Sequence, residues 1–356
     1  MSAESAPSKG SIRYRAGHPL VRYLVRRIAV SLLLVVGVTL VTFVLTNLVP
    51  GDPVAANVGQ RAAEDPAIVA AYRAHYGLDQ PLPVQYGTYI GNLVRGDLGE
   101  SQQTHRSVLT DLQAAVPATL ELALGAIVLS VVIGVGFGVV AAVRRGHLSD
   151  SALRVVSLVG ISVPTFWLAL VAFYVFSFQL DLAPGSGRLS PATSAPPDVT
   201  GLYTVDALLA GEWETFGDAV AHLMLPTLVL TLYTVGLLTR FTRSAVLEVL
   251  EQDFVRSARA KGLPGRTVLF RYVVRAAMVP ILTVVGLAFG ALLSGTVLVE
   301  QVFSWPGVGS YAYQAASHLD LPAVMGVGLF VGVVYLVINL VVDVLYGAID
   351  PRVRVS

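Results

Sequence analysis

Six long stretches without a charged residue constrain this chain more than any other feature of its sequence. Each is between 21 and 26 residues long, and a helix needs about 20 apolar residues to cross the hydrocarbon core of a bilayer. Because lipid offers the backbone no hydrogen-bond partner, such stretches must be helical. The sequence therefore predicts an all-α integral membrane protein with six transmembrane helices, at Ile28–Val49, Leu122–Val143, Val155–Leu180, Ala219–Thr239, Ala276–Val299 and Leu321–Val342.

The composition excludes several classes of function. Only 13% of the residues are charged, against about 25% in soluble proteins, and the net charge of +1 provides no basic field for nucleic acid. The absence of cysteine rules out thiolate metal sites and a cysteine nucleophile. The chain also lacks a phosphate-binding G-x-x-x-x-G-K-[ST] loop and an H-E-x-x-H pair. We therefore expect a non-catalytic protein that itself binds no cofactor, metal or nucleic acid.

The distribution of Lys and Arg predicts the orientation in the membrane. Six spans put both termini on one side, and the segments on that side carry 19 of the 24 Lys and Arg residues. The segments on the other side carry the remaining 5. Because positive residues are retained in the cytoplasm, the sequence predicts a multi-pass protein of the cell (plasma or inner) membrane with cytoplasmic N and C termini.

On this basis the chain divides into segments along its length. They are a cytoplasmic tail 1–27, a first transmembrane helix 28–49, an external helical segment 50–115, a core transmembrane domain 116–350 and a cytoplasmic tail 351–356. The core contains the remaining spans, at about 116–143, 152–180, 219–243, 276–299 and 321–345, and a cytoplasmic elbow at 244–275.

The two long external connections differ in their expected order. In the first, Asp65 can cap a helix that begins at Pro66 and ends at Gly77, and a second helix is expected over 83–94. We therefore predict a small ordered helical cap. The second connection, 181–218, contains a run rich in Pro, Gly and Ser, which predicts irregular structure.

A few polar residues lie at the ends of the predicted spans. Asp343 follows the sixth span, and Asn339 lies one turn before it. Because a charge at this depth normally finds a polar partner, we expect a structural role for both rather than a part in transport. Glu121 and Glu300 lie at the outer ends of spans. The sequence leaves open whether these two line a hydrophilic entrance or mark the boundary of the lipid.

The elbow 244–275 is the most informative cytoplasmic segment. Apolar residues continue past the fourth span, so we expect that helix to extend into the cytoplasm. Gly262 can adopt the left-handed conformation that ends a helix, Pro264 prevents immediate continuation, and a new helix is expected near Arg266. Composition alone fits two roles equally, a positive loop against anionic lipid and a docking surface for a cytoplasmic partner.

The elbow also resembles a known family. Residues 252–290 are similar to the EAA-loop region of binding-protein-dependent ABC importer permeases, with Ala258 and Gly262 at the motif's Ala and Gly. Arg256 replaces the motif's Glu, and Arg275 stands where many members have Pro. Further stretches resemble the B-type subunit of the dipeptide, oligopeptide and nickel branch: VPGDP (49–53), YGLDQPL (76–82), GDLGES (96–101), PATLELAL (117–124), PTFWLAL (164–170), EQVFSWPGVG (300–309) and NLVVDVLYGAIDPR (339–352).

This resemblance implies a type I ABC importer permease fold and a mechanism. The chain would pair with a C-type permease subunit, above two ATPase subunits or one fused ATPase that bind ATP and Mg, and below an external substrate-binding lipoprotein. Short peptides would cross by alternating access. The elbow would supply a coupling helix, about Asp253–Gly262, that sits in a groove of the ATPase. The residues implied in this coupling are Asp253, Arg256, Ala258, Arg259, Lys261 and Gly262.

The connection between the fifth and sixth spans is a candidate external gate. It carries no positive charge and several aromatic residues, which suits a membrane interface. The alternative is a half-inserted segment whose chain reverses at Pro306–Gly307. On that reading the gate residues are Glu300, Phe303, Pro306, Gly307 and Gly309.

Alternatives to a peptide importer stay open. The same scaffold can carry nickel chelates, glutathione or another small solute. A stand-alone channel or secondary transporter is disfavoured, because it would need ion-coupling residues inside the spans, and the six stretches are free of charge.

Overall fold

The structure, a computed structural model, describes all residues except 1–18, 49–53, 55–56, 58 and 350–356. The VPGDP stretch, most of the predicted N-terminal tail and the whole predicted C-terminal tail lie outside the described residues. Within the described part the chain is helical, and no strand forms there beyond a single bridge between Glu100 and Ser107. The predicted all-α fold is confirmed.

Helices occur at all six predicted spans and in the connections between them. The helices at the spans are α1 (Pro19–Leu48), α6 (Val108–Ser130) with the π-helix η1 (Val131–Val135) and α7 (Gly136–Val143), α8 (Leu148–Ser162) with α9 (Thr165–Ala172) and the π-helix η2 (Phe173–Gln179), α11 (Trp213–Leu250), α13 (Gly265–Thr267) with the π-helix η3 (Val268–Val274) and α14 (Arg275–Gly295), and α17 (Leu321–Ile349). The connecting helices are α3 (Gln60–Ala63), α4 (Pro66–His75), α5 (Leu82–Val94), α10 (Tyr203–Ala210), α12 (Asp253–Ala260), α15 (Val297–Val302) and α16 (Val308–Ser317).

Four of the six predicted spans form helices that are long and apolar enough to cross a membrane on their own. Among the described residues, four stretches qualify alone: Val108–Val143, Trp213–Leu250, Gly265–Ser294 and Leu321–Leu345. The helices α8 and α9 qualify only as a pair, because the chain bends by 94° between them. In α1 the apolar part is the shorter stretch Leu32–Leu45.

The third predicted span is therefore not one continuous helix. Helix α8 ends at Ser162, and Val163 is extended, with φ −82° and ψ 125°. The cause is Pro164, whose ring disfavours the helical conformation of the residue before it. Several other predicted boundaries also differ. Helices α1, α6 and α11 begin at Pro19, Val108 and Trp213 rather than at 28, 116 and 219, and α14 ends at Gly295 rather than at 299.

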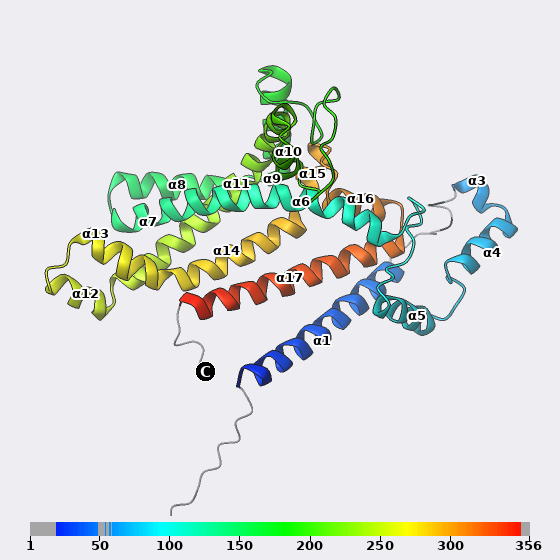
Figure 1. The fold of residues 1–356 in the computed structure, drawn as a ribbon, viewed down its shortest axis with the longest axis horizontal. Helices are drawn as coiled ribbons and strands as arrows, with labels where there is room; N and C mark the ends of the chain where they lie inside the picture. Colours follow the sequence, from blue (N-terminus) through cyan, green and yellow to red (C-terminus); the bar gives the residue numbers. More distant parts are fainter. Residues whose placement is uncertain (1–18, 49–53, 55–56, 58, 350–356) are drawn as a thin grey trace, which may run out of the picture.

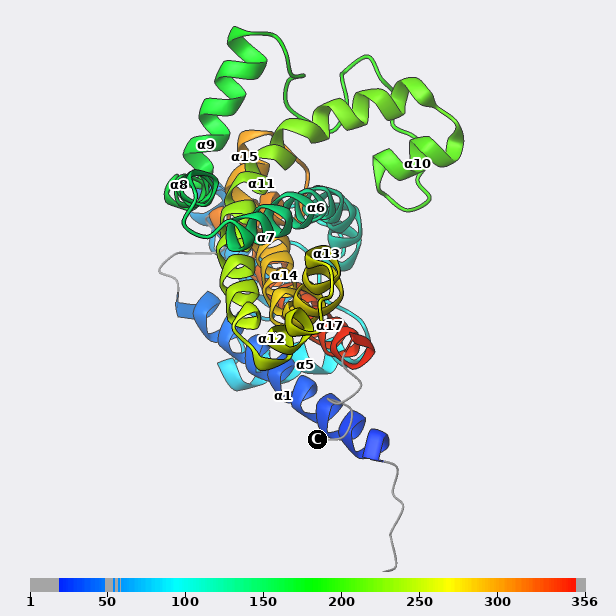
Figure 2. The same ribbon diagram turned by 90° about the vertical axis from the view of Figure 1, so that its left-hand side faces the viewer.

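The helices form a bundle with two distinct ends. In Figure 1, α1, α6, α14 and α17 run along the long axis, with α12 and α13 at one end and α16 towards the other. Helix α11 packs against α6, α7, α8 and α14, and α17 packs against α1 and α14. Helices α9 and α10 stand out to one side (Figures 1 and 2). The elbow and the connection after the fifth span therefore lie apart.

Small residues let the second span approach α11 closely. A Cβ on Gly134 would lie 2.8 Å from the Cβ of Leu238, and a Cβ on Gly138 would lie 2.5 Å from that of Thr242. A Cβ on Gly136 would meet no atom within 4 Å. Glycines at helix contacts are typical of membrane bundles, and here three of the four glycines in the span, Gly125, Gly134 and Gly138, lie against α11.

The connection between the first and second spans, predicted to be external, contains the two predicted helices. The side chain of Asp65 caps α4 by accepting a hydrogen bond from the N–H of Ala67 at 2.9 Å. Helix α5 packs on the outer part of α1, where the rings of Phe43 and Tyr86 are 5.2 Å apart. This segment is an ordered attachment to the first span.

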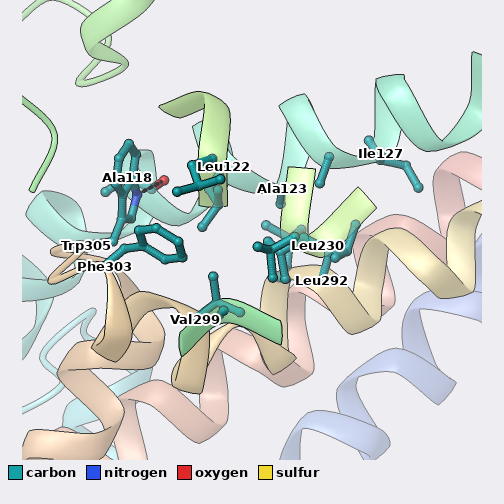
Figure 3. Packing of buried hydrophobic residues seen from close by; sticks show 14 of the residues in the cluster. Ala118, Leu122, Ala123, Ile127, Leu230, Leu292, Val299, Phe303 and Trp305 are labelled. Carbon is teal, nitrogen blue, oxygen red and sulfur yellow. Dashed lines mark hydrogen bonds between the residues drawn. The ribbon is translucent and has the colours of Figure 1, made fainter. Parts of the chain in front are cut away.

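Apolar clusters pack the segments at both ends of the bundle against its long helices. The largest contains Leu122 on α6, Leu230 on α11 and Leu292 on α14, together with Phe303 and Trp305 from the connection after the fifth span (Figure 3). A second cluster brings together α7, α11, α12, η3 and α14 near the elbow.

Candidate functional site

The elbow has the helix–turn–helix geometry that the sequence predicted. Helix α11 extends to Leu250, and the short helix α12 follows. Gly262 has a φ of +73°, and its N–H donates to the carbonyl of Arg259 at 2.9 Å. Pro264 then starts α13, which leads through η3 into α14. The left-handed glycine thus sets the angle between α12 and the start of the next span.

Helix α12 presents a charged face to solvent. The side chains of Asp253 and Arg256 are 94% and 79% exposed, and they form an ion pair at 3.3 Å. Arg259 and Lys261 are also exposed. Ion pairs this exposed contribute little to stability, so the charges on this face are available for a partner.

The opposite face of α12 is buried in the chain itself. Val255 is fully buried and Ala258 is 4% exposed, and both belong to the cluster formed with α7, α11, η3 and α14. We expected Ala258 to pack against the ATPase, and its position corrects that expectation. Its small side chain instead lets α12 lie close to the neighbouring ends of the spans.

An ion pair that the sequence analysis missed anchors this end of the bundle. Asp150, 1% exposed at the start of α8, accepts hydrogen bonds from Nε and Nη2 of Arg243 at 2.8 and 3.0 Å. A two-point contact of this kind fixes orientation as well as distance. Because Arg243 lies on α11 directly before the elbow, the contact holds this part of α11 to α8. The only sequence signal was an isolated Asp in the basic connection 144–154.

The connection after the fifth span folds into a packed hairpin of α15 and α16, called here the outer hairpin (Val297–Ser317). The chain reverses between α15 and α16 over residues 303–307, which include the predicted Pro306–Gly307. Ser304 has a φ of +49°, and the N–H of Gly307 donates to the carbonyl of Trp305 at 2.8 Å. Phe303 and Trp305 are 3% and 1% exposed, and the indole of Trp305 donates to the carbonyl of Ala118 at 2.8 Å (Figure 3). These aromatic side chains pack inside the protein rather than at a lipid interface.

Glu300 is fully buried at the centre of the outer hairpin. One carboxylate oxygen accepts hydrogen bonds from the hydroxyls of Thr119 and Thr296, both at 2.7 Å, and the other accepts from the N–H of Ser310 at 2.8 Å. Burial raises the pKa of Glu300, while these hydrogen bonds and one from Gly309 act to lower it. The residue therefore fastens the hairpin to α6 and lines no entrance in this conformation.

The predicted glycines of the hairpin make room for this carboxylate. A Cβ on Gly307 would lie 2.4 Å from Thr119 Oγ1 and 2.5 Å from Glu300 Cδ. A Cβ on Gly309 would lie 2.7 Å from the Cα of Val297. Pro306 is exposed beside them. The structure brings together all five predicted gate residues, with Glu300, Phe303, Gly307 and Gly309 buried.

The other polar residues near the spans have different surroundings. Glu121 is 5% exposed and pairs with Arg188 at 2.7 Å, so it lines no opening in this conformation. On α17, Asn339 is exposed and Asp343 is half-buried. The structural role expected for both residues stays a prediction.

Two families match this chain. Residues 134–355 match the family described as the binding-protein-dependent transport system inner membrane component. Residues 20–123 match the N-terminal family of the membrane components of such systems.

Curated relatives match over nearly the whole length. The probable D,D-dipeptide transport system permease protein of Escherichia coli K12 is 46% identical, covering 90% of this chain and 94% of that protein. The di/tripeptide transport system permease protein of Pseudomonas aeruginosa UCBPP-PA14 is 44% identical, covering 94% and 99%. The dipeptide transport system permease protein of E. coli K12 is 38% identical, covering 94% and 99%. A solved structure of the inward-facing MetNI methionine ABC transporter covers 68% of this chain and 97% of that chain, with a TM-score of 0.49 and 15% identity, a likeness too weak to carry an inference.

Proposed function

Because this chain belongs to the family of binding-protein-dependent transport system inner membrane components, we propose that it imports short peptides, delivered by an external substrate-binding lipoprotein, into the cytoplasm by alternating access. Family membership confirms the resemblance to ABC importer permeases, and with it a permease subunit rather than an enzyme. One observation supports the assignment of peptides as the cargo. Relatives that are 38% to 46% identical over almost their full length are named as dipeptide or di/tripeptide permeases.

The elbow supplies the connection to ATP. The chain has no phosphate-binding loop, so ATP and Mg are held by its ATPase partners, two subunits or one fused chain. The exposed face of α12 docks in the ATPase, and its buried face transmits the movement to α11 and α14 through the cytoplasmic cluster. Shifting a two-state membrane domain from 1:99 to 99:1 requires about 5.5 kcal/mol, and a rigid elbow can deliver the energy of ATP binding to the bundle.

A second, C-type permease subunit completes the translocation pathway. The isolated chain leaves large apolar side chains exposed on α9 and η2, with Trp167 at 52% and Phe178 at 75%. The partner subunit and membrane lipids cover such surfaces. The 19 of 24 Lys and Arg residues on the side of the termini support cytoplasmic termini in the cell membrane, with the outer hairpin facing the substrate-binding lipoprotein.

Uptake by the complete transporter tests the cargo. The chain, its partner permease, the ATPase and the binding protein are reconstituted together in liposomes, with ATP on the ATPase side. We expect ATP-dependent accumulation of a labelled dipeptide, and none when the binding protein is omitted. Accumulation of a nickel chelate or of glutathione in place of the dipeptide would assign the same scaffold to another solute.

A further inference from the structure

A buried ion pair between Glu121 and Arg188 lies beside the outer hairpin and has no part in the mechanism above. The two side chains are 5% and 7% exposed, and Arg188 Nη2 lies 2.7 Å from Glu121 Oε2. The other carboxylate oxygen accepts hydrogen bonds from the N–H and the hydroxyl of Thr204 at 2.7 and 2.6 Å. Losing one partner of such a pair leaves a buried charge uncompensated, so the contact strongly favours one arrangement.

Arg188 connects three segments that are distant in sequence. Besides Glu121 on α6, its Nη2 donates to the carbonyl of Gly201 at 2.8 Å. Its guanidinium lies 3.5 Å from the ring centre of Tyr203 and 5.8 Å from that of Trp305 in the outer hairpin. A guanidinium over an aromatic face is held electrostatically. Arg188 therefore joins α6, the hairpin and the segment 184–204, which we call the outer loop.

The outer hairpin is fastened to the same helical turn. This turn comprises residues 117–121 of α6. The carbonyl of Ala118 accepts a hydrogen bond from the indole N–H of Trp305, and the hydroxyl of Thr119 accepts one from the N–H of Val308, both at 2.8 Å. The outer loop meets the hairpin directly, because the N–H of Gly187 donates to the carbonyl of Phe303 at 2.8 Å. One turn of α6 thus holds both elements.

The outer loop is irregular but is braced by carboxylates of α10 and α11. Asp206 accepts hydrogen bonds from the N–H and hydroxyl of Thr200 at 2.9 and 2.7 Å and from the N–H of Gly201 at 2.9 Å. Burial acts to raise the pKa of Asp206, and these hydrogen bonds outweigh it and lower that pKa. The N–H and hydroxyl of Ser190 bind Asp218 at 2.7 and 2.8 Å. A loop braced in this way can move as a unit.

We propose that Arg188 is a positioning residue for the external gate, whose ion pair with Glu121 makes the outer loop and the outer hairpin open and close with α6 as one body. The proposal rests on the transport function proposed above, since it concerns how the outer gate moves. It excludes a mobile loop that opens independently of the hairpin, and it assigns Arg188 no contact with the cargo.

Distances between spin labels test whether the two elements move together. The chain has no cysteine, so Ser194→Cys in the outer loop and Gln314→Cys on α16, both exposed positions, can be labelled specifically in the complete transporter. We expect one narrow distance distribution that is the same without nucleotide and with ATP and vanadate. A distance that shifts between these states would show independent movement and overturn the proposal.

Variants of the pair test the role of Arg188. Arg188→Met should broaden the label distribution and lower uptake about tenfold, because Glu121 is left buried and unpaired. The double variant Glu121→Leu/Arg188→Met should restore both, since apolar side chains can replace a buried ion pair. Arg144→Met, at an exposed position after α7, is the matched control and should change neither.

Each outcome of these variants bears on the proposal. An unchanged distribution in Arg188→Met overturns it. Recovery of the narrow distribution without recovery of uptake in the double variant also overturns it, because the charge would then act on the cargo. If a variant does not assemble, the proposal is still tested by the label distances in the protein with Glu121 and Arg188 intact, compared without nucleotide and with ATP and vanadate. If the wild-type complex takes up no peptide, the proposed cargo fails while the distances still answer this question.

Discussion

Gly262 and Gly307 are required for different physical reasons. Gly262 has a φ of +73°, which costs a side chain about 1–2 kcal/mol, but a Cβ there would meet no atom within 4 Å. At Gly307 the φ is −100°, a value open to any residue, but a Cβ would overlap Thr119 and Glu300. Backbone strain governs the first position and lack of space governs the second, so different substitutions test them.

Gly262→Val should abolish uptake and uncouple or detach the ATPase, whereas Gly262→Asn should retain both activities. Asn tolerates the left-handed conformation and finds open space, while a β-branched residue is strained there and tilts α12. The measurement is substrate-stimulated ATPase activity together with transport by the reconstituted complex, with membrane insertion checked for both variants. Wild-type values for Gly262→Val would show that this elbow is not the coupling element.

Gly307→Ala should destabilise the outer hairpin and reduce uptake, because the added methyl group forces Thr119 and Glu300 apart. Overpacking of this kind costs about 1–3 kcal/mol. Gly185→Ala, in the outer loop, is the matched control, since its Cβ would meet no atom within 4 Å. Thermal unfolding of the purified complex in detergent measures the effect, and identical curves for the two variants would contradict the close approach.

Residues that act within their own turn could be predicted from the sequence. Asp65 caps α4 and Gly262 ends α12 as expected. The contacts of Glu121 and Glu300 join residues 67 and 181 positions apart, and no local pattern reveals such pairings. The sequence therefore placed both carboxylates near the outer ends of spans and left their surroundings open. The same limit explains Ala258, whose small size indicated a close contact but not with which neighbour.

At the scale of helices, hydropathy predicts where a span occurs but not its direction. The apolar run through α8, α9 and η2 is continuous in sequence, yet the chain bends by 94° within it. Pro164 supplied the only local signal, and proline is tolerated both in kinked and in broken membrane helices. Which of the two forms results depends on packing against α11 and α15, which the sequence alone does not contain.

The contact between α7 and α11 depends on the identity of a single glycine. Gly138→Val should lower the melting temperature of the purified complex, because its Cβ would lie 2.5 Å from that of Thr242 and 2.9 Å from the carbonyl oxygen of Thr239. Gly136→Val, two residues away, faces open space in this chain and should have little effect. Equal destabilisation by both would mean that helix propensity, not packing, controls this span.

The first external connection is a separate element at the end of the bundle away from the elbow. Helix α5 is fastened to α1 by the hydroxyl of Tyr86, which donates to the carbonyl of Val36 at 3.3 Å, and by ring contacts. Removing residues 60–95 should therefore impair uptake and leave the ATPase bound. Uptake and copurification of the ATPase are measured on the same preparation. Normal uptake by the deleted form would show that this segment neither seals the outer mouth nor contacts the binding protein.

At the scale of the whole molecule, the two candidate sites occupy different ends of one bundle. The elbow and the anchor between Asp150 and Arg243 gather at one end, and the outer hairpin gathers at the other (Figure 1). Helices α6, α11 and α14 run between them and share the largest apolar cluster. Movement at the elbow can therefore reach the gate through these spans, and the direction of transport depends on which end faces the cytoplasm.

The absence of cysteine allows this orientation to be tested with single introduced thiols. His147→Cys, in the exposed turn before α8, and Gln314→Cys, on the exposed face of α16, lie on opposite sides of the predicted topology. A membrane-impermeant maleimide should label Gln314→Cys in intact cells and His147→Cys only in inverted vesicles, because the connections on the side of His147 carry most of the Lys and Arg residues. The unsubstituted chain is the control for background labelling. The reverse pattern would invert the assignment, and α12 would then face away from any cytoplasmic ATPase.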